Sequence, residues 1–530
     1  MKIFTIILLN LLMFSSLLAN DIQTDAQALI SNNFAQKESA ILSLTKNYKG
    51  NERLEVLLQK LLSGDLYFTK ENNQIVFLKD KIDNNYYTVD VFSNEALKEA
   101  SKYDFVKIKI NNKLRNIING SLAQLNLLSK DEDKRLRSAK NLLKNLSIDD
   151  KEVIVEALSN EKSSSVKEVL EEANTILIAQ YGSNQKRYEA VEKLSEFISS
   201  KSLQTLKQLI NSEDQTLKSI AKSSLEIVEL KRSVFSIIET AFFGLSQGSV
   251  LLLAAIGLAI TFGVMKVINM AHGELIMIGA YTTYTIQQLL PNFIEYSVII
   301  AVPAAFIVSG VVGILIERLV IRHLYGRPLE TLLATFGVSL ILQQLVRTIY
   351  SPLNQEVKTP SWMSGALEVN SALFLTYNRL YIVLFSLMVF LAILYVMKKT
   401  SLGLKVRAVS QNRPIARAMG IKSSFIDAAT FGIGSGIAGV AGVALSQLTN
   451  VGPNLGQAYI VDSFMVVVFG GVGNLWGTLI ASLTLGEISK FIEPVAGAVL
   501  AKVIILVFII LFIQKRPRGL FPQKGRDAQD

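Results

Sequence analysis

Three polar residues stand close together near the start of a long apolar stretch. Asn269, His272 and Glu274 fall within residues 267–290, which are otherwise rich in apolar side chains. Ionisable side chains inside a membrane are costly, and they usually face the interior of a helix bundle or a cavity. These residues could hydrogen-bond a polar solute, or they could form a structural network that fixes a break between two helices. Both interpretations stay open from the sequence.

Four more polar residues lie in later apolar segments and are candidates for a polar pathway. They are Gln343, Gln344, Asp462 and Glu487. Carboxylate and amide groups offer the acceptors and donors that a small polar solute needs. For Asp462 a structural interpretation is equally good, in which the carboxylate is buried against a lysine or an arginine.

Enzyme chemistry is not expected in this chain. There is no cysteine, and the two histidines are His272 and His323, so most Cys- and His-based metal sites are excluded. No nucleophile–base pair or metal-ligand cluster is recognisable. The phosphate-binding pattern G-x-x-x-x-G-K-S/T does not occur. We therefore predict no catalytic residue, no metal and no cofactor.

The composition places these residues in a membrane protein that also has a polar part. Of the 530 residues, 50% are hydrophobic and 18% are charged. The formal net charge is +10, and residues 235–530, the hydrophobic part, contribute +8 of it. A positive balance in such a part indicates basic cytoplasmic loops, so we expect no nucleic-acid partner.

Residues 1–20 have the pattern of a secretory signal peptide. Lys2 supplies the positive start, residues 3–18 form the apolar core, and Ala19 suits the position before a cut. The alternative is an uncleaved anchor. In either case the chain from Asp21 onward is expected outside the cytoplasm.

Residues 21–232 are expected to form a mostly helical domain on that side of the membrane. Short strand-like runs between Gly64 and Ile110 predict a small β-meander, with turns at Asn72-Asn73 and Asn84-Asn85. The runs are 66–68, 74–78 and 86–91.

A weak helical repeat follows the predicted meander. An offset of 51 residues pairs Ala139 with Ala190 and Leu143 with Leu194, and each unit holds about three helices. This period is near that of HEAT and armadillo arrays, so we predict a HEAT-like domain.

Residues 235–515 are expected to form an all-α polytopic membrane domain with eight or nine membrane segments, several of them long enough to span a bilayer. The apolar segments are 241–264, 267–290, 296–318, 330–350, 380–397, 425–448, 459–473, 475–490 and 495–513. The seventh and eighth are short and are separated by the glycine-rich residues 470–474. They could be two half-helices or a re-entrant hairpin.

Basic residues predict the orientation of this domain. The basic stretches 318–327, 398–424 and 515–526 all fall in the cytoplasm if there are nine spans, or seven spans and a re-entrant pair. The loop 351–379 then lies outside, and residues 516–530 form a cytoplasmic tail. We expect a multi-pass protein of the bacterial inner membrane with a periplasmic N-terminal domain.

Four sequence motifs occur in order within or just after the membrane domain. They are VINMAHGELIMIGAY at 267–281, SLGLKVRAVSQNRPIARAMGI at 401–421, VFGGVGNLWGT at 468–478 and RPRGLF at 516–521. Together they resemble the LivH-type permeases of ABC importers for branched-chain amino acids and urea. The resemblance covers residues 235–521 and implies a transport function.

Two features are similar to the urea branch of this family, the UrtB type. One is the architecture, a signal peptide followed by an external helical-repeat domain. The other is the run YIVDSFMVVV at 459–468. Urea offers four N–H donors and one carbonyl acceptor, which suits carboxylate and amide side chains. The resemblance therefore implies that urea or a short amide is the solute.

The resemblance also implies that residues 398–424 form the loop that contacts an ATPase. A short helix is expected around 414–419, with Pro414 in its first turn and a stop at Gly420. The residues expected to serve the contact are Arg407, Ala408, Asn412, Arg413, Ala416 and Gly420. The alternative is a loop that is merely positively charged.

The implied partners are a homologous second permease subunit, two cytoplasmic ATPase subunits, a periplasmic solute-binding protein and membrane lipid. A branched-chain amino acid permease is the alternative within the family. A membrane receptor and a passive urea channel are alternatives from other classes. The receptor would need a signalling domain, but only about 15 residues follow the last apolar segment. The channel would not need the motif at 401–421.

Overall fold

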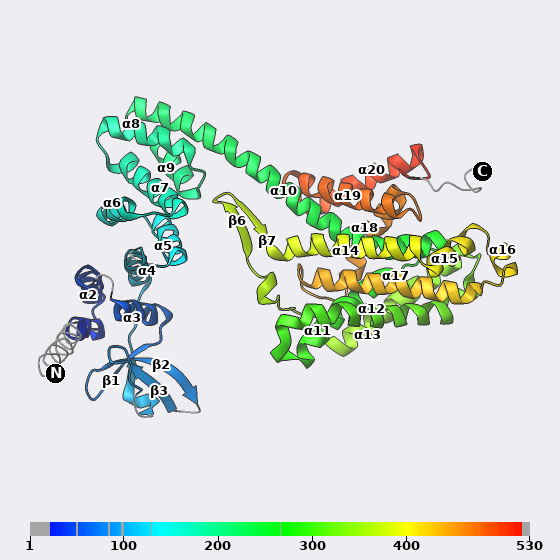
Figure 1. Ribbon diagram of the computed structural model, residues 1–530, viewed down its shortest axis with the longest axis horizontal. Helices are drawn as coiled ribbons and strands as arrows, with labels where there is room; N and C mark the ends of the chain where they lie inside the picture. The colour runs from blue at the N-terminus through cyan, green and yellow to red at the C-terminus, as the bar shows by residue number, and fades with distance from the viewer. Residues whose placement is uncertain are drawn as a thin grey trace, which may run out of the picture. The chain divides into compact units, whose positions relative to one another are not determined.

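The computed structural model describes residues 22–521, apart from 49–50, 83–84, 97–99, 128 and 266. The predicted signal peptide, residues 1–20, lies outside the described residues, and so does most of the predicted tail. The chain divides into two compact units, Met1–Arg232 and Ser233–Asp530, and each is described by itself. Figure 1 shows their elements in chain order.

The first unit begins with helices and a small antiparallel sheet. The elements are η1 (Gln27–Ile30), α2 (Phe34–Asn47), α3 (Glu52–Ser63), β1 (Leu66–Thr69), β2 (Ile75–Ile82), β3 (Asn85–Asp90), β4 (Ala100–Ser101), η2 (Lys102–Asp104) and β5 (Phe105–Lys107). The strand order is β4-β3-β2-β1-β5, so the first three strands form a meander where the sequence pattern predicts one. Asn73, in the turn between β1 and β2, has a φ of 53°, which asparagine tolerates better than most residues. The other predicted turn includes Asn84, which lies outside the described residues.

Helices fill the rest of the first unit. They are α4 (Asn112–Asn126), α5 (Glu132–Lys144), η3 (Ile148–Asp150), α6 (Lys151–Asn160), α7 (Ser164–Tyr181), α8 (Asn184–Lys193), η4 (Leu194–Glu196), α9 (Ser200–Leu209) and the first part of α10 (Gln215–Met265). The helices α8, α9 and α10 each begin about 51 residues after α5, α6 and α7. These starts agree with the offset seen in the sequence. The HEAT-like class itself stays a prediction.

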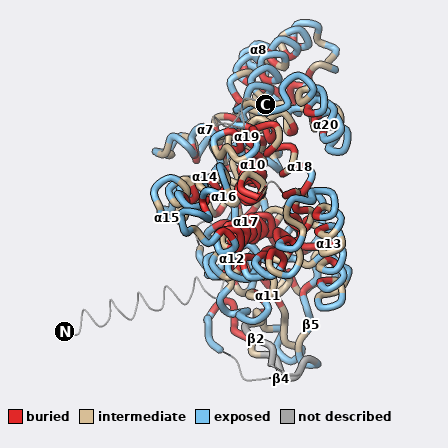
Figure 2. Tube along the Cα trace, turned by 90° about the vertical axis from the view of Figure 1, so that its right-hand side faces the viewer, coloured by how far each residue is buried: buried red, intermediate tan, exposed pale blue. Residues whose placement is uncertain are grey.

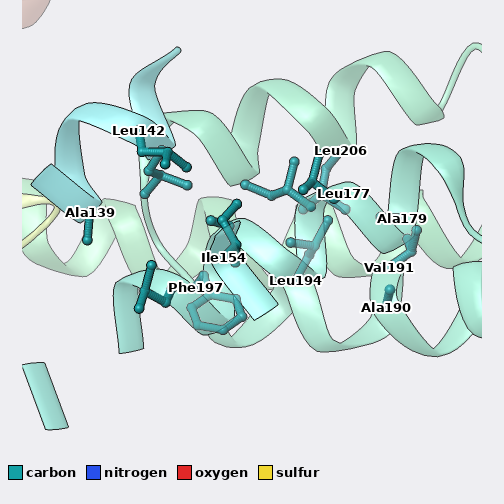
Figure 3. Close-up of a cluster of buried hydrophobic side chains, with 14 of the residues drawn as sticks. Ala139, Leu142, Ile154, Leu177, Ala179, Ala190, Val191, Leu194, Phe197 and Leu206 are labelled. Atoms are coloured by element: carbon teal, nitrogen blue, oxygen red, sulfur yellow. The ribbon is translucent and has the colours of Figure 1, made fainter. Parts of the chain in front are cut away.

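One apolar core joins these helices, and Figure 3 shows part of it. Ile154 of α6, Leu177 of α7 and Leu206 of α9 gather at its centre, and each is at most 2% exposed. The residues that the repeat pairs, such as Ala139 with Ala190, are buried in the same core. Each helix therefore buries one apolar stripe, as stacked helical units do.

The second unit consists of helices and one hairpin. After α10 come α11 (His272–Leu289), η5 (Pro291–Phe293), α12 (Ile294–Leu319), η6 (Ile321–Leu324), α13 (Pro328–Tyr350), η7 (Ser361–Met363), β6 (Ala366–Asn370), β7 (Leu373–Thr376), α14 (Tyr377–Lys399), α15 (Ser401–Gln411), α16 (Arg413–Ala418), α17 (Ser423–Ser446), α18 (Leu455–Gly470), α19 (Leu475–Ala496) and α20 (Ala498–Lys515). A helix lies in each of the nine predicted apolar segments.

Length and composition single out some of these helices as membrane spans. Within the described part of the chain, six helices are long and apolar enough to cross a membrane: Gln215–Met265, Pro291–Leu319, Pro328–Tyr350, Tyr377–Lys399, Ser423–Ser446 and Ala498–Lys515. The expected total of eight or nine membrane segments therefore stays a prediction. The short helix α18 has 16 residues and is joined to α19 by residues 471–474. Whether this pair re-enters the membrane also stays a prediction.

The centre of the second unit is built from α11, α12 and α17, which pack tightly on one another. Helix α17 is buried along almost its whole length, as its red trace in Figure 2 shows. Glycines allow this packing, because a Cβ atom at Gly279 of α11 would overlap the carbonyl of Gly439 in α17. The glycines of α17 therefore serve helix packing within the chain.

Candidate functional site

A backbone break between α10 and α11 positions the first group of predicted site residues. The side chain of Asn269 accepts a hydrogen bond from the backbone N–H of Ala271, at 3.0 Å. The N–H of Met270 donates to the hydroxyl of Thr335 in α13, at 3.1 Å. The Nε2 atom of His272 lies 2.9 Å from the carbonyl oxygen of Ala254 in α10. The first two bonds satisfy backbone N–H groups that the break would leave without partners, and the third ties His272 to α10.

Glu274, in the first turn of α11, extends this group to α13. Its Oε1 atom accepts hydrogen bonds from the hydroxyl of Ser339, at 2.9 Å, and from the amide of Gln343, at 2.7 Å. Asn269, His272 and Glu274 are each 1% exposed. Four of the predicted pathway residues, namely these three and Gln343, are thus buried near the start of α11, and we call them the α11 network. Glu274 and Gln343 are hydrogen-bonded to each other, whereas His272 bonds α10 and Asn269 bonds the backbone of the break.

Two polar atoms of the α11 network keep hydrogen-bonding capacity. The Oε2 atom of Glu274 and the Nδ2 atom of Asn269 are buried and have no hydrogen-bond partner among the described residues. One is an acceptor and the other is a donor. Buried polar groups are nearly always paired, so such atoms point to a solute, a water or another conformation.

The remaining predicted pathway residues do not join this network. Gln344 is exposed on α13, so the structure does not bring it to Gln343, and its place in the pathway stays a prediction. The reason is geometric, because neighbouring residues on a helix point in directions about 100° apart. Glu487 of α19 is partly buried, and its carboxylate lies against Gly244 of α10.

Asp462 has the structural partner that its alternative interpretation required. Its Oδ2 atom lies 2.9 Å from the Nζ atom of Lys502 in α20. A cavity of about 20 Å³ beside this pair, lined also by Gln247 and Ser489, is large enough for about one water molecule. The geometry therefore gives Asp462 the ion-pair partner of its structural interpretation, and its role in the pathway stays a prediction.

The predicted ATPase-contact loop forms two short helices, α15 and α16. The side chain of Asn412 accepts a hydrogen bond from the N–H of Ile415 at 3.0 Å and so caps α16. Gly420 has a φ of 82°, a left-handed conformation that ends the helix as expected. Ala416 is 4% exposed, and Ala408 packs against the apolar core. The guanidinium of Arg407 donates to the carbonyl of Met397.

Two surface residues of α16 were missed by the sequence reasoning. Ile415 and Met419 are 61% and 78% exposed, although both are large and apolar. The predicted contact residues Asn412, Ala416 and Gly420 shape or support the helix, and Arg413 turns inward onto Asp427 of α17. The spacing of Ile415 and Met419 could have predicted this shared surface, since positions four apart lie on one side of a helix.

Tyr325, just after η6, was also missed. Its hydroxyl donates to the Oε1 atom of Glu317 in α12 at 3.0 Å, and its ring lies 5.0 Å from the guanidinium of Arg413. Burial raises the pKa of Tyr325 far above its usual value, so the hydroxyl keeps its proton and stays a donor.

The described residues contain no cluster of acidic or histidine side chains that could hold a metal ion.

Two of the sequence motifs meet at the end of α18. The N–H of Leu520 donates to the carbonyl of Phe469, at 2.9 Å, and the side chain of Asn474 donates to the carbonyl of Phe521, at 3.1 Å. The residues RPRGLF thus close the end of the helix that carries VFGGVGNLWGT. A side chain at position 519 would clash in this contact, because a Cβ atom there would lie 2.7 Å from the backbone of Gly471.

A bundle of long apolar helices with a buried polar network and a basic, helical loop defines a membrane transport domain. The chain belongs to the family described as the permease component of the branched-chain amino acid transport system, whose profile matches residues 240–513, just over half of the chain. It is therefore a permease component of an ABC transporter.

Three relatives illustrate the range of similar proteins. The high-affinity branched-chain amino acid transport system permease protein BraD of Pseudomonas aeruginosa is 29% identical over 52% of this chain and 93% of its own length. The corresponding protein LivH of Escherichia coli strain K12 is 30% identical over 53% of this chain and 94% of its own. The ribose import permease protein RbsC of the same strain is 25% identical over 54% of this chain and 88% of its own. No solved structure matches the chain significantly.

Proposed function

We propose that this chain is the permease subunit of an ATP-driven importer that moves urea or a short amide across the bacterial inner membrane. The α11 network carries the proposal. Its buried Glu274 Oε2 and Asn269 Nδ2 atoms have no partner among the described residues, and together they offer one acceptor and one donor.

A urea-like solute carries the donor and acceptor groups that these two atoms lack. An amide N–H can donate to the carboxylate of Glu274, and the carbonyl oxygen of the same molecule can accept from Asn269. A site that supplies buried hydrogen-bond partners rejects solutes that lack the matching groups, because its own polar atoms would then stay unpaired. Glu274 can stabilise the helix contact and bind a solute at the same time. Its Oε1 atom bonds Ser339 and Gln343 of α13, and its Oε2 atom makes neither bond.

The partners follow from the class of transporter. No nucleotide-binding motif occurs in this sequence, so separate ATPase subunits must supply the energy. We propose that α15 and α16 contact one of two cytoplasmic ATPase subunits, that a homologous permease subunit completes the pathway, and that a periplasmic protein delivers the solute. We propose that residues 22–232 lie in the periplasm and help to dock that protein; unchanged affinity after their deletion would contradict this role.

A branched-chain amino acid is the second candidate solute. The observation that favours it is the description of the relatives, because BraD and LivH are both named as branched-chain amino acid permeases. RbsC, which is named for ribose, shows that related sequences move different solutes.

Uptake measurements separate the two solutes. Cells with and without the gene are given labelled urea or labelled leucine at low concentration. Loss of urea uptake alone supports the proposal, whereas loss of leucine uptake alone replaces the solute. The variant Glu274→Gln is then compared with Glu330→Gln, an exposed control in the first turn of α13. We expect Glu274→Gln to lower uptake roughly tenfold, because an amide replaces one of the two acceptor oxygens, and the control to leave uptake unchanged. Equal uptake by both variants would remove Glu274 from the pathway.

A further inference from the structure

Arg413, Asp427 and Glu317 form a charged cluster, together with Tyr325, between α16 and the interior of the domain. Arg413 forms a two-point ion pair with Asp427 of α17, with Nη1–Oδ2 at 2.6 Å and Nη2–Oδ1 at 2.9 Å. The ring of Tyr325 covers the guanidinium, and the hydroxyl of Tyr325 donates to Glu317 of α12. The cluster thus joins α16 to two of the three helices that form the centre of the membrane domain.

The two carboxylates of this cluster are buried and therefore depend on their cationic and hydrogen-bonding partners. The side chains of Asp427 and Glu317 are each 1% exposed, while that of Arg413 is 26% exposed. Glu317 has two further charged neighbours, Arg318, whose Nε atom lies 3.7 Å from its Oε2 atom, and Arg322. A buried carboxylate that loses its cation is strongly unfavourable, so the Arg413–Asp427 pair resists separation. Its fork geometry fixes direction as well as distance, which a single ammonium group would not do.

Helix α16 has few other attachments to the domain. It spans six residues, from Arg413 to Ala418, and the apolar side chains of Ile415 and of the C-cap residue Met419 are exposed. Beside the ion pair, Ala416 packs inward and Arg417 bonds the hydroxyl of Ser423 at 2.8 Å. Among the described contacts of α16, the Arg413–Asp427 pair is the ionic link to a helix of the central group.

We infer that Arg413 is a positioning residue that transmits movement of α16 to α17 and, through Tyr325 and Glu317, to α12. This inference rests on the proposed function, in which α16 is seated on an ATPase subunit. Helices α12 and α17 both pack on α11, which carries Glu274. A displacement of α16 therefore reaches the α11 network through packed helices and a directional ion pair. Arg413 would then set how much transport each ATP drives, and it would not itself hold the ATPase.

The test measures uptake and ATP hydrolysis together in proteoliposomes that contain the complete transporter. The probes are labelled urea and labelled leucine. The variants are Asp427→Asn, which keeps the shape and removes the charge, and Arg413→Lys, which keeps the charge and removes the fork. Glu330→Gln, at an exposed position in the first turn of α13, is the matched control for loss of one charge.

We expect Asp427→Asn to lower uptake per ATP about tenfold, a usual size for coupling between sites. Arg413→Lys should give an intermediate ratio, and Glu330→Gln the ratio of the unchanged protein. The amount of co-purified ATPase subunits should stay the same in all variants, which separates coupling from assembly. Variants that keep the original ratio, or that lose uptake only in proportion to lost ATPase subunits, overturn the inference. An unchanged transporter that moves neither probe overturns the proposed function, and the inference with it.

Discussion

Asp462 and Lys502 form an ion pair, with 2.9 Å between Oδ2 and Nζ, that ties α18 to α20. The aspartate side chain is 11% exposed and the lysine side chain 47% exposed. Helix α18 is the shorter partner and is closed at its far end by the motif at 516–521. The ion pair therefore holds α18 against α20, where most of the surrounding side chains are apolar. This geometry favours a structural function for Asp462.

The first prediction concerns that ion pair. Lys502→Met should destabilise the solubilised protein by roughly 1–3 kcal/mol, less than for a fully buried pair because the lysine is half exposed. Adding Asp462→Leu should recover most of the loss, since the carboxylate is then no longer left alone. Thermal unfolding followed by size-exclusion chromatography measures both. Asp462→Asn should leave uptake unchanged. If this variant lost uptake while its stability stayed normal, Asp462 would belong to the solute pathway.

The second prediction concerns the helix packing around α17. Gly279→Leu should prevent α11 from approaching α17, because even a Cβ atom at this position meets the backbone of Gly439. Overpacking of this kind costs about 1–3 kcal/mol or more, so the amount of folded transporter should fall. Gly337→Leu on α13 is the control, since a Cβ atom there meets nothing within 4 Å. Equal yields of the two variants would show that the helices adjust.

The sequence was sufficient to place the apolar helices and the strands β1 to β3, whereas β4, β5 and the β6–β7 hairpin were not predicted. Nine apolar segments predict nine helices, and period-two runs predict β1 to β3, because burial of apolar side chains selects the periodicity. The local form of α16 also followed from the residue types, since Asn412 is a good cap, Pro414 suits the first turn and Gly420 suits the stop.

The partners of side chains could not be predicted in the same way. Gln343 and Gln344 are neighbours of one residue type, and only packing against α11 decides that Gln343 is buried. Arg413 lies in a basic stretch that suggests an outward contact, yet its guanidinium turns toward Asp427. A charge run reports the side of the membrane and not the direction of each side chain. Such contacts join segments far apart in the sequence, so a local pattern does not contain them.

The third prediction concerns Glu172 of α7, whose carboxylate accepts hydrogen bonds from Ser199 and Ser202 in a buried setting. Burial raises its pKa above the ordinary value of 4.5. A raised pKa means that this group's contribution to stability is complete below that ordinary value and is lost as pH rises through the folded pKa. The unfolding temperature of a fragment of residues 22–232 should therefore fall from this cause as pH rises from 4.5 through the raised pKa of Glu172.

Glu172→Gln isolates this contribution. The neutral amide cannot ionise, so the variant should lose less stability than the unchanged fragment over the same pH range. Glu168→Gln, at an exposed position of the same helix, should keep most of the original pH dependence. Identical pH profiles for Glu172→Gln and the unchanged fragment would contradict the argument.

The fourth prediction concerns the outward side of α16. Ile415 and Met419 are exposed apolar side chains on a surface that we propose to contact an ATPase subunit. Truncating large residues at the centre of an interface often costs 2 kcal/mol or more, so a charge at either position should be at least as disruptive. Ile415→Asp and Met419→Asp should therefore lower the ATPase co-purified with the permease by roughly tenfold or more. Leu289→Asp, an exposed apolar position at the other end of the domain, should retain it. If all three variants recover the same amount, α16 is not the contact, and residues of α15 would be tested next.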